Sequence, residues 1–83
     1  MNMRQKYATE YDIQVIEAYD LLNTLFGNGL LPSLSVQETA IAEWCKGNNA
    51  YWYKFIPKNE FIRWTIMQAA EQGYKTIVWD MQP

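Results

Sequence analysis

The stretch NNAYWYKFIPK, residues 48–58, places four aromatic rings within the five positions 51–55. Tyrosine, tryptophan and phenylalanine favour β-strands, and the two asparagines that follow Gly47 are typical of a turn. Pro57 prevents the pattern from continuing into a helix interior, because proline has no backbone N–H to donate there. The stretch therefore predicts a strand over residues 50–56.

A second strand is predicted after one more helix. Residues 58–72 have helical periodicity and end at Gly73, and residues 74–81, YKTIVWDM, have the composition of a strand. The connection between the strands is about eighteen residues long and contains the helix, which suits a right-handed parallel crossover. An antiparallel arrangement is the alternative. The core face of the helix is expected to hold Phe61, Ile62, Thr65, Ile66 and Ala69.

Two helices are predicted before the aromatic strand. Apolar residues at positions 15, 19, 22 and 26 are spaced by four, three and four, which indicates an amphipathic helix over about residues 10–26. The sequence GNG that follows provides a stop signal. Ser35 and Glu38 match a capping box that begins a second helix over about residues 36–46.

These elements predict an α+β fold, a single small globular domain over residues 1–83 with the order α-α-β-α-β. Two or three strands are expected to pack against the helices. Because an isolated pair of strands is only marginally stable, a third strand is needed. It is expected either from residues 2–8 or from another copy or another protein.

Large apolar side chains lie on both faces of the aromatic strand. Alternation places Tyr51, Tyr53 and Phe55 on one face and Trp52, Lys54 and Ile56 on the other. Three helices cover one face of so small a sheet more easily than both, so one face is expected to bind a partner. Lysine is rarely fully buried, so the face of Trp52, Lys54 and Ile56 is assigned to the interface and Phe55 to the core. The simpler alternative is a half-buried strand that binds nothing.

The last predicted helix offers a second candidate surface. A rotation of 100° per residue places Trp64 and Met67 opposite its core face, next to Arg63. Tryptophan, methionine and arginine are enriched at protein interfaces, so Trp64 and Met67 are predicted to bind a partner. In the alternative, Trp64 packs beneath the first helix, in a core that wraps around the last one.

Charge is distributed unevenly along the chain, whose net charge is −2. No basic residue lies between Lys6 and Lys46, an interval that contains Glu10, Glu17 and Asp20. These three acids are expected to face solvent on the first helix, where they could steer a basic protein partner. In the alternative, the acidic and basic halves face each other and partly neutralise.

The composition disfavours several chemistries. The chain has no histidine, which removes histidine-based metal sites, acid–base pairs and catalytic triads. Cys45 is predicted near a helix C-terminus, where the helix dipole disfavours a thiolate, so a small buried thiol is expected. We therefore expect no enzyme activity, no metal and no cofactor.

Cellular location and nucleic-acid binding are predicted from composition as well. A single cysteine and the absence of a long apolar run predict a cytoplasmic protein that does not enter a membrane. Nucleic acid is not expected as a partner, because the net charge is negative and no basic recognition helix follows the second helix.

Residues 59–79, a predicted helix followed by GYKTIVW, resemble the helix–strand ending of barstar-like inhibitors. The resemblance covers about a quarter of the chain, and no functional residue is carried over from it. The function predicted is that of a small acidic, non-catalytic protein-binding module, such as a phage or mobile-element inhibitor, an antitoxin-like protein or an adaptor, with homodimerisation as a further option. The alternative is a nucleotide or single-stranded nucleic-acid binder that stacks bases on residues 51–55.

Overall fold

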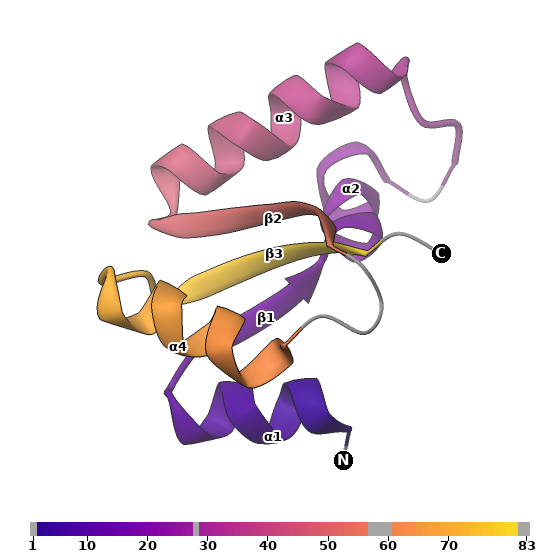
Figure 1. Cartoon of the computed structure of the whole chain (residues 1–83). Helices are drawn as coiled ribbons and strands as arrows, with labels where there is room; N and C mark the ends of the chain where they lie inside the picture. Colours follow the sequence, from indigo (N-terminus) through magenta and orange to yellow (C-terminus); the bar gives the residue numbers. More distant parts are fainter. Residues whose placement is uncertain (1, 28, 57–60, 82–83) are drawn as a thin grey trace.

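The computed structural model describes residues 2–27, 29–56 and 61–81, except for the side chains of Phe55, Ile56 and Met81. Within these residues the chain forms four helices and three strands (Figure 1). In chain order they are α1 (Met3–Glu10), β1 (Gln14–Glu17), α2 (Ala18–Phe26), α3 (Leu34–Gly47), β2 (Ala50–Ile56), α4 (Ile62–Glu71) and β3 (Thr76–Met81). The predicted α+β class is confirmed, and the predicted order α-α-β-α-β is found from α2 onward.

The strands form one parallel sheet in the order β1-β3-β2. β3 lies in the middle, where Ile77 is opposite Val15 on β1 and Tyr51 on β2. The strand predicted over residues 50–56, the closing strand and their parallel connection through α4 are therefore confirmed. The antiparallel alternative is wrong.

The prediction of one helix over residues 10–26 is wrong, because residues 14–17 form β1. The chain leaves α1 through Asp12, whose left-handed backbone has a φ of 55° and cannot continue a helix. The Ile13 N–H then donates to the Ala8 carbonyl, and the chain extends into a segment whose β-branched residues favour a strand. The third strand thus comes from residues 14–17, and the segment proposed as an edge strand, residues 2–8, belongs largely to α1.

Helices cover both faces of the sheet. Ile77 and Trp79 of β3 pack on one face against α1 and α4, whereas Val78 points the opposite way and packs against α2 and α3. All three side chains are at most 1% exposed. Figure 1 also shows α3 alongside β2 and α1 alongside β1, so helices lie next to both outer strands. The expectation that one aromatic face of the sheet stays open is therefore wrong.

The two middle helices differ from the prediction in their buried face and in their start. Tyr19 was expected in the core of the first helix but is 66% exposed, and α2 instead buries Ala18, Leu21 and Leu22. The spacing was misleading because its first member, Val15, belongs to a strand. The N-cap of α3 is Ser33, so the helix begins before the predicted capping box of Ser35 and Glu38.

Candidate functional site

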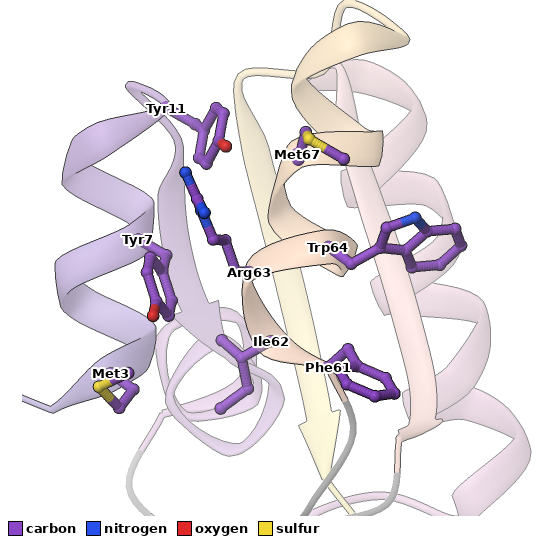
Figure 2. Close-up of a pocket in the computed structure, with 8 residues that line it drawn as sticks. All are labelled: Met3, Tyr7, Tyr11, Phe61, Ile62, Arg63, Trp64 and Met67. Carbon is purple, nitrogen blue, oxygen red and sulfur yellow. The ribbon is translucent and has the colours of Figure 1, made fainter.

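A groove lies on the surface between α1 and α4 (Figure 2). Its volume is about 590 Å³. Its walls combine aromatic, aliphatic and thioether side chains with one guanidinium, from Met3, Tyr7, Tyr11, Phe61, Ile62, Arg63, Trp64 and Met67. The groove is therefore apolar over most of its lining and carries its charge at Arg63.

The α1 wall of the groove is a stripe with a spacing of four residues. Met3, Tyr7 and Tyr11 recur at this interval, which places them on one side of the helix. Ala8, on another side of α1, is buried against the sheet. Met3 is 51% exposed and both tyrosines are half-buried, so the groove side of α1 presents apolar surface to solvent.

Along α4, a stripe with a spacing of three residues is formed by Phe61, Trp64 and Met67. Figure 2 shows Phe61 and Trp64 on the flank of α4 that faces away from α1, so they border the groove and do not face α1 across it. Trp64 is 59% exposed and Met67 is half-buried, and both lie away from the buried side of α4, as the periodicity predicted. Phe61 was expected in the core, but it is 82% exposed. It lies at the N-cap, before the first helical residue, where its backbone (φ −68°, ψ 88°) is not helical and the periodicity no longer applies.

Arg63 introduces a charge between the two walls. Its Nη2 donates to Glu10 Oε1 at 2.9 Å, and its guanidinium carbon lies 5.8 Å from the Tyr7 ring centroid and 6.0 Å from that of Tyr11. The hydrogen bond to Glu10 and the charge of that carboxylate raise the pKa of Arg63 above its ordinary value. The guanidinium thus stays charged and ties α4 to the C-terminal end of α1.

Trp52 and Lys54, also predicted to bind a partner, lie on the opposite side of the sheet. Trp52 is half-buried beside α2 and α3, and the Lys54 ammonium lies 5.2 Å from its ring centroid and forms an ion pair with Glu38. Both side chains line a smaller hollow of about 290 Å³. The side chain of Ile56, the third predicted residue of that face, lies outside the described part of the structure.

The three acids predicted to share an exposed helix face are separated by the fold. Glu10 ends α1 and pairs with Arg63, while Glu17 ends β1 and forms an ion pair with Arg4 of α1. Asp20 lies in the first turn of α2 and is exposed. A single acidic face on one helix is therefore absent from the described residues, and two of these acids hold α1 in place instead.

The tyrosine rings of β2 contact other aromatic rings. The Tyr51 ring centroid lies 4.4 Å from that of Tyr53 and 5.2 Å from that of Tyr74, and Tyr53 lies 6.0 Å from Trp79. The Tyr53 hydroxyl donates to the Thr65 carbonyl at 3.2 Å, and burial raises the pKa of Tyr53. Rings held in this way offer little free face for a stacked base.

The expected burial of Cys45 is also confirmed, and burial raises the pKa of its thiol.

Sequence reasoning found Trp64 and Met67 but missed the rest of the groove. The spacing of Met3, Tyr7 and Tyr11 was a usable signal, but it was lost because residues 2–8 were considered only as a strand. Phe61 was missed because it was assigned to the core. No signal in the sequence indicated that the two stripes lie on neighbouring helices, since α1 and α4 are about fifty residues apart.

Comparison with known proteins gives no family for this chain. No protein-family model matches it, and neither does any curated protein or solved structure. The helix–strand ending over residues 59–79 is present as α4 and β3, but it remains a local resemblance. In the part of the chain that the structure describes, no helix is long and apolar enough to cross a membrane, and no three Cys, Asp or Glu side chains form a group that could hold a metal ion.

Proposed function

We propose that this protein is a non-catalytic protein-binding module and that the α1–α4 groove is its binding site. Phe61 and Trp64 carry the proposal, because these large aromatic residues are 82% and 59% exposed at the edge of an apolar groove. Aromatic residues, methionine and arginine are the residue types enriched at protein interfaces and among their energetic hot spots. An inhibitor, an antitoxin-like protein and an adaptor all act through such a surface.

The position of Phe61 supports a binding role in a second way. An N-cap residue that can accept a hydrogen bond stabilises a helix by about 1 kcal/mol relative to an apolar one. Phenylalanine has no such acceptor, and its ring at this position is mostly in water rather than in the core. Phe61 therefore contributes little to the stability of α4, and residues that break local stability rules are expected at functional sites.

The hollow beside Trp52 supports the proposal less well. It is about half as large as the groove, and Lys54 at its border is engaged by Glu38. The groove is therefore the primary site, and Trp52 and Lys54 are secondary candidates. Binding of nucleotides on residues 51–55 has weaker support still, because the rings of Tyr51 and Tyr53 face other rings.

Affinity capture with a matched control tests this proposal. The immobilised wild type, Trp64→Ala and Tyr19→Ala are each exposed to the same bacterial lysate, and bound proteins are quantified by mass spectrometry. Tyr19 is a suitable control because it is 66% exposed on α2, outside the groove, and because it lines the smaller hollow beside Trp52, so Tyr19→Ala tests that secondary site at the same time. We expect a partner that wild type and Tyr19→Ala retain and that Trp64→Ala loses by about 30-fold or more, equivalent to the 2 kcal/mol of a hot spot. A partner retained equally by all three proteins would place the binding site elsewhere.

A further inference from the structure

We propose that the partner of the α1–α4 groove is a second copy of this chain, bound through a two-fold interface that places the two grooves face to face. This inference rests on the proposed function, since it names an occupant for the same site. Any heterologous partner of the groove would then compete with the second copy.

The shape of the groove suits a two-fold interface. Such an interface brings one surface patch against the same patch of the other copy, so the patch needs both a projection and a hollow. In Figure 2, Phe61 and Trp64 project from the flank of α4 that faces away from α1, while Tyr7 and Arg63 lie between the two helices. A rotation of 180° can thus place the projecting rings of each copy over the hollow of the other.

The charges of the groove are compatible with contact between two copies. A patch of one sign would repel itself across a two-fold axis, but here Arg63 is paired with Glu10, and the Lys6 ammonium lies 5.8 Å from the Tyr7 ring centroid. The exposed carboxylates of Asp20 and Glu43 are on α2 and α3, on the other side of the sheet. Asp20 and Glu43 thus lie away from the patch, and Glu10 beside it is paired with Arg63, so the patch carries no cluster of one sign that would repel its own copy.

The exposed apolar area is sufficient for a weak dimer. Phe61, Trp64 and Met3 are 82%, 59% and 51% exposed. With a buried area of about 150–250 Å² for each fully buried aromatic side chain, covering these three removes on the order of 400 Å² per copy. Two copies together bury roughly 800 Å² of apolar surface. Protein interfaces are slightly more than half apolar, so this corresponds to a total buried area of about 1,200–1,600 Å², which is within the range of specific interfaces. Interfaces of this size differ widely in affinity, and because only three of the groove's described apolar side chains are this exposed in each copy, we expect a dissociation constant at the weak, micromolar end of that range.

Sedimentation velocity of the purified chain tests the inference directly. Wild type is expected to change from monomer to dimer between about 1 and 300 µM, a range that brackets a micromolar Kd. Tyr19→Ala should behave like wild type, whereas Trp64→Ala should weaken the dimer by about 30-fold or more. Arg63→Glu should also weaken it, because it places two acids beside each other within each copy and so disturbs the packing of α4 against α1 that builds the patch. The double variant Glu10→Arg with Arg63→Glu restores the opposite charges and should recover the dimer.

Circular dichroism of each variant confirms that it is folded. A wild type that stays monomeric across the range overturns the inference, and so does a dimer that Trp64→Ala and Arg63→Glu leave unchanged. The capture experiment separates this failure from that of the proposed function. A monomeric protein that retains a Trp64-dependent partner refutes the dimer alone, whereas a Trp64-dependent dimer that retains no other protein refutes only the heterologous partner.

Discussion

Replacing two tryptophans by alanine should separate the core of this protein from its binding surface. Trp79 is 1% exposed on β3, with Arg4 lying 5.5 Å from its ring centroid and Tyr53 lying 6.0 Å away. Emptying such a site costs about 3–5 kcal/mol in the free energy of unfolding. Trp64 is 59% exposed, so roughly two-fifths of its surface is buried, and scaling by that fraction predicts a cost of about 1–2 kcal/mol for Trp64→Ala. The two variants should thus differ by at least about 2 kcal/mol.

Urea denaturation followed by circular dichroism measures both values without relying on tryptophan fluorescence. Because a domain of this size loses about 4–8 °C in Tm per kcal/mol, thermal melting should show the same difference as a gap of roughly 10 °C or more. The measurement is made at about 1 µM or below, the monomeric end of the expected transition, so that dimer formation does not add to stability. Equal destabilisation by the two variants, within about 0.5 kcal/mol, would mean that Trp64 is packed in the core and that the groove is not an open surface.

Three further outcomes are expected. Burial raises the pKa of Cys45 above its ordinary 9.0 and that of Tyr53 above its ordinary 10.0. The folded protein therefore favours the neutral thiol and phenol over their ionised forms, and at neutral pH both groups are neutral. The stability that this preference contributes is lost as pH rises through the folded-state values, so unfolding free energy should fall above about pH 9, and less steeply in Cys45→Ala. Asp20→Lys should change the free energy of unfolding by less than about 0.5 kcal/mol. Glu10→Lys should cost more, because the new lysine would lie beside Arg63. Equal effects of the two variants in urea titrations would contradict the ion pair between Glu10 and Arg63. Finally, melting curves should be unchanged by chelator or reductant, and a large shift with either would reveal a metal or disulfide.

The part of the fold that sequence could predict is the part in which local preference and tertiary structure agree. β2 combines residues of high strand propensity with turn residues before it, and α4 has a continuous helical period, so both were predictable. The stretch around β1 was not, because Val15 happens to lie at helical spacing from Tyr19 and Leu22 although it belongs to β1 and they belong to α2. The positive φ of Asp12 is set by how the chain must turn to reach β3, and no local pattern encodes that requirement.

The candidate site was predictable only on one side. The far side of α4 follows from the period of its own core residues, which is why Trp64 and Met67 could be named. The other wall depends on the packing of α1 against α4, a contact between segments far apart in sequence. The prediction of an interface around Trp52 did not include the packing of α2 and α3 on that face of the sheet, which also depends on contacts between distant segments.

The central position of β3 has a consequence for the order in which this protein can fold. Within residues 2–27, 29–56 and 61–81, β1 and β2 do not pair with each other, and each pairs only with β3, which is the last of the three strands along the chain. During synthesis, both earlier strands must therefore wait as unpaired segments until residues 76–81 have left the ribosome. Until then only local helices can form outside the ribosome, and the sheet cannot begin to assemble. Pairing of both outer strands with the last strand therefore makes sheet formation a late and non-local step of folding, which follows the synthesis of residues 76–81.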